Sequence, residues 1–305
     1  MLIVVLLNWT LDIMEKPEIS VCIPTYNRLD YLPMAVHSVL DQKCDGFTYE
    51  IVILDDGSTD GTEDWVKAQN YPIRYQWQEN SGLAAARNRL IELARGKYIT
   101  FLDSDDLLVN DALLRLYQSI GQRDDACAYG GYIRIDEHGN RLPTKQKRRP
   151  SGRIVQALFS SVIVHSCGSL FPRRVLIETG GFDENLRSCP DYIKYLQLSA
   201  KFDFYGLEDP TFLRRRHSGN MSQENSRSIK QELTLLKRFY FEELRETLVD
   251  PEVARRRLAK EAYRVAKLAN REGLDCQLVQ DYCRESLRYH SSIKPLLLYL
   301  RQQFR

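Results

Sequence analysis

A cluster of acidic residues directly follows an apolar run at positions 97–102. The cluster consists of Asp103, Ser104, Asp105 and Asp106. Carboxylates this close repel one another and raise each other's pKa, unless a cation lies among them. Mg²⁺ and Mn²⁺ prefer oxygen ligands and often share them between carboxylates and substrate phosphates. The cluster alone therefore predicts either a diphosphate–metal site or a solvated turn whose aspartates cap a helix.

Polar residues also follow two earlier apolar runs. The run at 19–24 leads into Thr25, Tyr26 and Asn27, and the run at 49–54 leads into Asp55 and Asp56. In open sheets of parallel strands, ligands bind beyond the carboxyl ends of the strands. We therefore expect these two groups and the acidic cluster to meet at one edge of a sheet and to form one site.

The surrounding elements must form that sheet. Apolar runs alternate with segments of helical periodicity through the first 120 residues, which predicts an α/β fold with a mainly parallel sheet. The runs are continuously apolar, as in strands covered on both faces. The predicted strands are 19–24, 49–54, 73–77 and 97–102, and the predicted helices are 30–42, 59–69 (capped by Ser58 or Thr59), 83–94 (closed by Gly96) and 111–120.

The rest of the chain is less regular at first and then becomes helical. We expect a strand at 127–135, a mobile polar loop at 136–153, a helix at 191–200 and a short strand at 202–207. From about residue 223 nearly all of the sequence has helical periodicity. The predicted organisation is an apolar leader at 1–16, an α/β domain at 17–222 and a helical extension at 223–305.

Several motifs, taken in order, resemble glycosyltransferase family 2, which has the GT-A fold. The resemblance covers roughly residues 17–222. It is carried by residues 21–28 (VCIPTYNR), 53–62 (ILDDGSTDGT), 80–88 (NSGLAAARN) and 101–106 (FLDSDD), and it continues at 180–184 (GGFDE), Asp191 and 217–222 (HSGNMS). It implies a mixed, mainly parallel sheet flanked by helices, and an inverting transfer of a sugar from a nucleotide-sugar donor.

The resemblance implies roles for the donor side of the site. Pro24 and Tyr26 would hold the nucleotide base, and the carboxylate of Asp56 would accept a hydrogen bond from an N–H of uracil or thymine. Arg87 would face the nucleotide or a carboxylate, or form a structural salt bridge. The set expected to bind the nucleotide sugar is Pro24, Tyr26, Asn27, Asp56, Arg87, Asp103 and Ser104.

The resemblance also implies a metal and a catalytic base. Asp105 would ligate the metal directly, and His217 would supply a second ligand as a neutral imidazole. A histidine ligand favours Mn²⁺ over Mg²⁺. Asp191 would take the proton from the acceptor hydroxyl. The family often has an acidic pair at this position, whereas this chain has Pro190 before Asp191, a residue well tolerated in a first helical turn.

Two other readings use the same residues. A nucleotidyltransferase of this fold would show a glycine-rich phosphate loop near the first strand, and residues 24–28 contain no glycine. A non-catalytic module that binds a nucleotide sugar or a glycan would bind the donor without transferring the sugar. The presence of the acidic cluster, Asp191 and His217 together argues against that module.

Composition limits the partners. A net charge of +2 over 305 residues leaves no overall field for binding nucleic acid. The seven cysteines form no CxxC pair, so we expect reduced thiols in a cytoplasmic protein.

The apolar leader is too short to span a bilayer, and it is either a misassigned start, with Met14 as the true one, or a weak interfacial anchor. The resemblance to glycosyltransferase family 2 implies an acceptor that is a glycan or a lipid-linked glycan of surface polysaccharide or lipopolysaccharide synthesis. The basic run at 145–153 and the C-terminal helices leave open a peripheral contact with the inner face of the membrane.

Overall fold

The computed structural model describes residues 16–186, 190–219, 225–244 and 247–303. Nearly all of the predicted leader, including Met14, lies outside these residues. So do Cys189 and positions 220–222 of the last motif of the resemblance.

The amino-terminal half of the sheet consists of four parallel strands. β1 (Ile19–Thr25) pairs with β2 (Tyr49–Asp55) on one side and with β4 (Tyr98–Phe101) on the other, and β3 (Ile73–Trp77) pairs with β2. Thr25 is in register with Asp55, so the polar groups that follow these two strands begin at the same level. This half confirms the predicted parallel sheet.

The other half of the sheet mixes directions. The strand order is β3-β2-β1-β4-β8-β6-β9-β5, and β7 pairs with β6. β8 (Ser169–Pro172) is antiparallel to β4 and to β6 (Ala126–Ile135), whereas β9 (Asp203–Arg215) is parallel to β6. The short strands β5 (Leu107–Leu108) and β7 (Arg141–Leu142) run antiparallel to β9 and β6. β9 is longer than the predicted strand at 202–207 and reaches the acidic cluster through β5.

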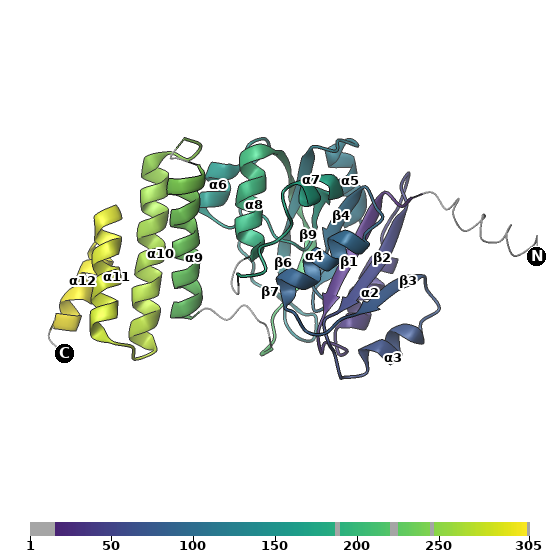
Figure 1. The fold of residues 1–305 in the computed structure, drawn as a ribbon, viewed down its shortest axis with the longest axis horizontal. Coiled ribbons are helices and arrows are strands. Elements are labelled where there is room, and N and C mark those ends of the chain that lie inside the picture. Colours follow the sequence, from purple (N-terminus) through teal and green to yellow (C-terminus); the bar gives the residue numbers. More distant parts are fainter. Residues whose placement is uncertain (1–15, 187–189, 220–224, 245–246, 304–305) are drawn as a thin grey trace, which may run out of the picture.

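Helices cover both faces of the sheet (Figure 1). Two large hydrophobic clusters form the core, one containing Val21, Ile23 and Val36, and the other containing Leu90, Phe101 and Tyr195. This confirms the expectation from the continuously apolar strands. The helices are α2 (Leu32–Leu40), α3 (Thr62–Lys67), α4 (Leu83–Leu93), α5 (Ala112–Ile120), α6 (Val155–Ser160), α7 (Arg173–Glu178) and α8 (Pro190–Lys201).

Four further helical segments follow, arranged as a row beside α8 (Figure 1). α9 and α10 share the core of the α/β part, for example through Leu233 and Leu258, whereas α11 and α12 pack around a small cluster that contains Val279. The segments are α9 (Ser226–Arg238), which continues into a π-helical turn (Phe239–Glu243), α10 (Pro251–Arg271), α11 (Cys276–Tyr289) and α12 (Ile293–Gln303). The domain limits at 17–222 and 223–305 stay a prediction.

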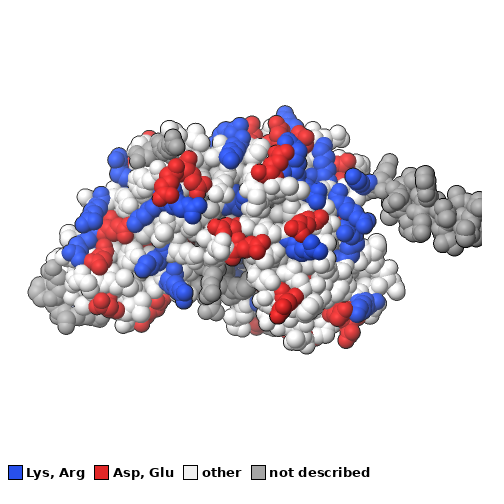
Figure 2. Space-filling model, in the orientation of Figure 1, with Lys and Arg blue, Asp and Glu red and all other residues white. Residues whose placement is uncertain are grey.

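Charges of both signs are mixed on the surface. Figure 2 shows Lys and Arg side chains interspersed with Asp and Glu over the face drawn, which accords with the net charge of +2. Within the described part of the chain, no helix combines the length and the apolar character needed to cross a bilayer.

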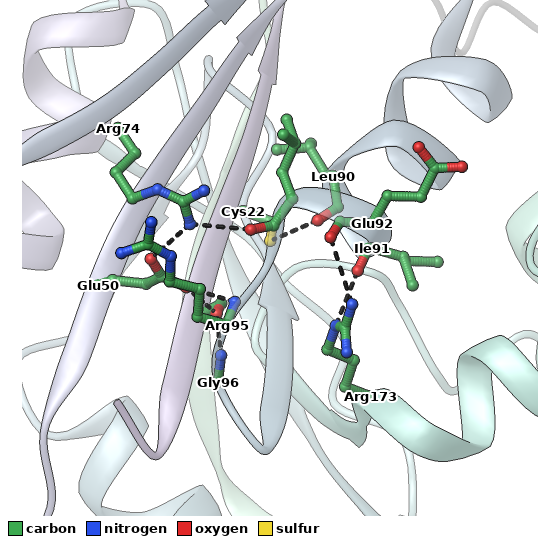
Figure 3. Close-up of polar contacts among 11 residues, drawn as sticks. Cys22, Glu50, Arg74, Leu90, Ile91, Glu92, Arg95, Gly96 and Arg173 are labelled. Carbon is green, nitrogen blue, oxygen red and sulfur yellow. Dashed lines mark hydrogen bonds and ion pairs between the residues drawn. The ribbon is translucent and has the colours of Figure 1, made fainter. Parts of the chain in front are cut away.

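A polar network fixes the carboxyl end of α4 against the sheet (Figure 3). The last carbonyls of a helix have no partner within the helix. Here Arg74 donates to the carbonyl of Leu93 at 2.8 Å, and Arg173 donates to the carbonyl of Ile91 at 2.9 Å. Glu50 accepts from Arg74 at 2.8 Å, which ties the helix end to β2 and β3. This network holds α4 so that its amino-terminal turns, which carry Arg87, face the carboxyl edge of the sheet.

Two predicted helix ends were wrong. The helix expected at 59–69 begins at Thr62. Its first turn is bonded by Asp60 rather than by Ser58 or Thr59, because the N–H of Thr62 donates to the Asp60 carboxylate at 3.2 Å. Gly96 does not close α4: the helix ends before Ala94, which has extended backbone angles, and Arg74 and Arg173 bond the free carbonyls. The segment 136–153 contains the two-residue strand β7, and Arg149 donates to the carbonyl of Glu208 at 2.6 Å, whereas the predicted mobility of this segment stays a prediction.

Candidate active site

The loop after β1 is braced against the loop after β2. Asn27 adopts a left-handed conformation, with φ of 48°, which asparagine tolerates better than most residues. Its N–H donates to Ser58 Oγ at 2.8 Å, and its side-chain oxygen accepts from the N–H of Thr59 at 2.8 Å. Pro24 is buried, and the ring of Tyr26 is half exposed. The fixed loop therefore presents an aromatic face to solvent beside the carboxyl ends of the strands.

Asp56 is buried and bound by the loop that precedes α4. One carboxylate oxygen accepts from Gln78 at 2.7 Å and from the N–H of Ser81 at 2.9 Å, and the other accepts from the N–H of Gly82 at 2.9 Å. The side chain thus orients the entry to α4. The predicted contact of Asp56 with a nucleotide base would need a lone pair of the carboxylate that these three hydrogen bonds do not use. That contact stays a prediction.

Arg87 joins the acidic cluster to the predicted base. It is the charged residue of α4 that points into the protein, and only 2% of its side chain is exposed. Its guanidinium donates to Asp103 at 2.8 Å and lies 3.9 Å from a carboxylate oxygen of Asp191. Burial alone would lower the pKa of Arg87, but the charges of Asp103 and Asp191 raise it above its ordinary value. Two carboxylates from distant parts of the chain are thus brought to one cation.

Asp191 lies in the first turn of α8, which begins at Pro190 as the sequence allows. One of its oxygens accepts from the hydroxyl of Ser166 at 3.3 Å. The hydroxyl of Ser166 in turn accepts from the hydroxyl of buried Tyr195 at 2.9 Å. About a third of the Asp191 side chain remains exposed. The carboxylate is therefore oriented by Ser166 on its buried side and accessible to solvent on the other.

Asp105 and His217, the two residues that the resemblance implies as metal ligands, are in direct contact. The Nε2 atom of His217 lies 2.9 Å from a carboxylate oxygen of Asp105. The imidazole is buried, stacks on Tyr31 with 4.7 Å between ring centroids, and accepts from the N–H of Gly219 at 3.1 Å. Arg215, at the end of β9, donates to the backbone carbonyl of Asp105 at 3.0 Å. β9 therefore delivers His217 to the acidic cluster.

Asp106 adds a third carboxyl group to the acidic cluster. Asp106 is buried and accepts from the N–H of Arg215 at 2.9 Å. Burial, together with the charges of Asp103 and Asp105, raises the pKa of Asp106 well above its ordinary value. Such a set of carboxylates beside an imidazole fits a divalent cation that accepts oxygen and nitrogen ligands.

Cys167 belongs to a second group of residues that could hold a metal ion. Ligand atoms of Asp103, Asp106 and Cys167 lie within 4.8 Å of one another. However, burial and the two aspartates raise the pKa of the Cys167 thiol well above its ordinary value, and its sulfur accepts from the N–H of Asp103 at 3.2 Å. A thiol must lose its proton to ligate a metal. We therefore regard the Asp105–His217 pair as the better start of a metal site.

Several residues of this arrangement were not singled out from the sequence. Tyr31 and Arg215 hold the His217 region, and Ser166 and Tyr195 hold Asp191. Arg215 lies in the visible run of three arginines at 214–216, but nothing in that run marks the one that turns inward. Ser166 follows an irregular stretch without a motif, so no sequence signal connected it to the site.

A separate cavity lies on another face of α8. It has a volume of about 290 Å³ and is lined by Gly181, Ile193, Lys194 and Leu235, among others. Its lining does not include Arg87, Asp103 or Asp191. The chemistry described above is therefore distinct from this cavity.

The fold and this arrangement define a GT-A glycosyltransferase. The profile described as "Glycosyl transferase family 2" matches residues 20–180, more than half of the chain. The chain therefore belongs to glycosyltransferase family 2, as its motifs indicated.

Curated relatives carry related names. TuaG of Bacillus subtilis, a glycosyltransferase named for teichuronic acid biosynthesis, is 34% identical over 209 residues, which cover 66% of this chain and 78% of TuaG. Chondroitin synthase of Escherichia coli is 34% identical over 210 residues, covering 68% of this chain but 30% of the synthase. An uncharacterised glycosyltransferase of Rickettsia bellii is 30% identical, and the match covers 64% of this chain and 28% of that protein. The chain thus spans about a third or less of the length of these last two relatives.

Solved structures share the fold. S. aureus TarS 1–349 in complex with UDP-GlcNAc superposes with a TM-score of 0.66 at 16% identity, covering 93% of this chain and 89% of that one. The mannosyltransferase PcManGT of Pyrobaculum calidifontis, in complex with GDP-Man and Mn²⁺, gives a TM-score of 0.58 at 18% identity, covering 95% of this chain and 81% of that one. Both matches extend over more than nine tenths of this chain.

Proposed function

We propose that this glycosyltransferase moves a sugar, with inversion, from a UDP- or dTDP-sugar to a hydroxyl of a glycan or lipid-linked glycan. The observation that carries the proposal is the position of Asp191. Its carboxylate is held by Ser166 and by Arg87, and Arg87 also holds Asp103 of the acidic cluster. A candidate base thus lies next to a candidate diphosphate site.

Asp191 is the proposed catalytic base. Inverting transfer needs a carboxylate that takes the proton of the acceptor hydroxyl as the new bond forms. The Ser166–Tyr195 pair orients one face of Asp191, and the exposed third of the side chain is available to the acceptor. Arg87 places a positive charge 3.9 Å from the carboxylate and links it to Asp103 of the acidic cluster.

Asp105 and His217 are the proposed ligands of a Mn²⁺ or Mg²⁺ ion, with Asp103 near the ribose or in support. When bound, such an ion offsets the negative charge of the nucleoside diphosphate that leaves. The 2.9 Å contact between a carboxylate oxygen of Asp105 and Nε2 of His217 supports this assignment. The Mn²⁺ in the PcManGT complex gives it further support by analogy of fold.

The donor and acceptor are proposed from chemistry and from the relatives. An exposed Tyr26 ring offers a stacking surface for a base, and the carboxylate of Asp56 is an acceptor for the N–H of uracil or thymine. The TarS complex contains a UDP-sugar and the PcManGT complex a GDP-sugar, so both bases occur in this fold. The names of TuaG and of chondroitin synthase favour an acceptor in polysaccharide synthesis.

A screen of nucleotide sugars tests the function. Purified protein with Mn²⁺ is incubated with UDP-, dTDP- and GDP-sugars, and binding and slow hydrolysis of the donor are measured. We expect metal-dependent binding and hydrolysis of a UDP- or dTDP-sugar. Binding without hydrolysis, or without transfer to any polysaccharide fragment, would favour a non-catalytic binding module. The absence of binding with every donor would refute the proposal.

A further inference from the structure

The last helix, α12 (Ile293–Gln303), has an apolar face without a partner among the described residues. On one side it packs against α11 through Leu298 and Tyr299, and the side chain of Gln302 donates to Asn270 of α10 at 2.8 Å. The other side exposes a stripe of four large apolar side chains. These are Ile293 (68% exposed), Leu296 (44%), Leu297 (50%) and Leu300 (41%).

The spacing of these four residues makes one continuous stripe. Positions 293, 296, 297 and 300 are separated by three, four and seven residues, so they lie on the same face of a helix. An isolated exposed leucine needs no explanation, but a contiguous apolar stripe on a surface helix marks a contact surface. In Figure 1 this helix ends the row of C-terminal helices, at the extremity of the molecule remote from the sheet.

The charge around the stripe indicates what covers it. From residue 286 to residue 305 the sequence contains Arg288, Lys294, Arg301 and Arg305 and no Asp or Glu. Lys294 and Arg301 are seven positions apart, so both flank the stripe on the same side, and both are exposed. The last acidic groups before this segment, Asp281 and Glu285, are paired with Arg284 and Lys237. Within α12 itself, the charged residues beside the apolar face are therefore both cations, Lys294 and Arg301.

This combination fits an anionic lipid surface better than a second copy of the chain. A symmetric pair of α12 helices would place the cations of one copy near those of the other, which is unfavourable. A helix with an apolar face, flanking Lys and Arg, and low overall hydrophobicity is suited to lie in the headgroup region. We propose that α12 binds the surface of a membrane containing anionic lipids, with its apolar stripe among the acyl chains. The attachment goes beyond the proposed function and does not depend on it.

Vesicle sedimentation of the full chain tests this proposal. We expect the protein to sediment with vesicles of phosphatidylcholine and phosphatidylglycerol at 3:1, and to bind vesicles of phosphatidylcholine alone at least tenfold more weakly. Leu297→Gln with Leu300→Gln removes the centre of the stripe without changing charge, and Lys294→Gln with Arg301→Gln removes the flanking cations. Each pair should weaken binding to the anionic vesicles at least tenfold. Ile177→Gln, which replaces an equally exposed apolar residue on α7, is the matched control and should bind like the wild type.

Two results would overturn the proposal. One is wild-type protein that stays in the supernatant with anionic vesicles, or a stripe variant that binds them as well as the wild type. The other is evidence that the stripe serves self-association. In that case the wild type would sediment as a dimer without lipid in the ultracentrifuge and the stripe variant as a monomer, and neither protein would bind vesicles. Circular dichroism of each variant checks that it folds. Donor binding measured without lipid tests the proposed function separately.

Discussion

The guanidinium of Arg87 donates to the carboxylate of Asp103 at 2.8 Å, although only 2% of the Arg87 side chain is exposed. The same guanidinium lies 3.9 Å from Asp191. A buried arginine is stable only when its charge is matched, and here the matching charges come from Asp103 and Asp191. The sequence left open whether Arg87 faces the nucleotide or a carboxylate of the acidic cluster, or forms a structural ion pair. The structure pairs Arg87 with Asp103, a carboxylate of that cluster.

Replacing Arg87 should harm both stability and activity. Arg87→Met removes the cation but keeps an apolar stem between Phe101 and Phe182, which lie 5.8 Å from the guanidinium. Because two carboxylates lose their partner, we expect the free energy of unfolding to fall by about 3 kcal/mol. Urea denaturation measures this. Arg87→Lys should recover part of the stability but little of the activity, since one ammonium cannot reproduce the planar donor set. Full activity in Arg87→Lys would contradict this role.

Asp191→Asn should abolish transfer while leaving donor binding nearly unchanged. The loss of a general base typically lowers kcat by about 10²- to 10⁴-fold. Calorimetry with the nucleotide sugar and a transfer assay separate the two effects. Asp281→Asn, an exposed carboxylate on α11, is the control. Ser166→Ala should cause a smaller fall in kcat with an unchanged KM for the donor, because it only orients Asp191. Undiminished turnover in Asp191→Asn would remove Asp191 from the mechanism.

Removal of the metal should stop the reaction. Treatment with a chelator should abolish transfer, and added Mn²⁺ should restore it. In Asp105→Asn and in His217→Gln we expect the apparent Kd for Mn²⁺ to rise at least about tenfold, as the loss of groups around a metal generally causes. Binding of Mn²⁺ followed by thermal shift gives a readout that does not rely on activity. Unchanged Mn²⁺ binding in both variants would relocate the site, with Asp106 and Cys167 as the residues to test next.

Glu50 should contribute to stability in a pH-dependent way. Burial alone would raise its pKa, but hydrogen bonds from Ser20, Arg74 and the N–H of Arg95 lower the pKa below its ordinary value. A carboxyl group with a lowered pKa stabilises the folded state above its unfolded pKa of about 4.5, and this contribution is lost as the pH falls below it. Glu50→Gln should therefore cost about 1.5–3 kcal/mol at pH 7 and less at pH 4. Glu92→Gln, on the exposed side of α4, should be close to neutral at both pH values.

Lys194, unlike Glu50, should destabilise the folded state at neutral pH. This residue of α8 is buried and donates to the carbonyl of Thr179 at 2.7 Å, and burial lowers its pKa to about 8. Between pH 8 and the ordinary value of 10.5 the unfolded chain binds more proton than the folded one, so folding becomes more favourable as the pH rises through this window. We expect Lys194→Met to gain stability relative to the wild type at pH 7, and the gain to shrink by pH 9.5. A constant difference in urea denaturation would contradict this.

Strands β1, β2 and β4 of the parallel half of the sheet could be predicted from the sequence because they are short, largely apolar and followed by polar residues. Strand β3 was predicted at 73–77 and lies there. The ends of helices were less predictable. The carboxyl end of α4 depends on Arg74 and Arg173, which come from a strand and a later helix, and no local signal near Gly96 shows them.

The same distinction holds for the site. Resemblance led to Asp105, Asp191 and His217, and the structure brings Asp105 to His217 and Asp191 to Arg87. Their supporting residues could not be predicted, because Ser166 and Tyr31 act through contacts between segments far apart in the chain. The roles of Tyr26 and Asp56 in binding a base remain predictions.

The end of β9 returns the chain to the loop after β1. The side chain of Arg28 donates to the carbonyl of Gly219, 191 positions later, and Tyr31 stacks on His217 in the same region. A recombinant fragment cut at residue 180, where the match to the family profile ends, would keep the acidic cluster but lose Asp191, Arg215 and His217. Such a fragment would lack the proposed base and the contact of Arg28 with Gly219, so we expect the smallest piece able to work as an enzyme to extend past Gly219.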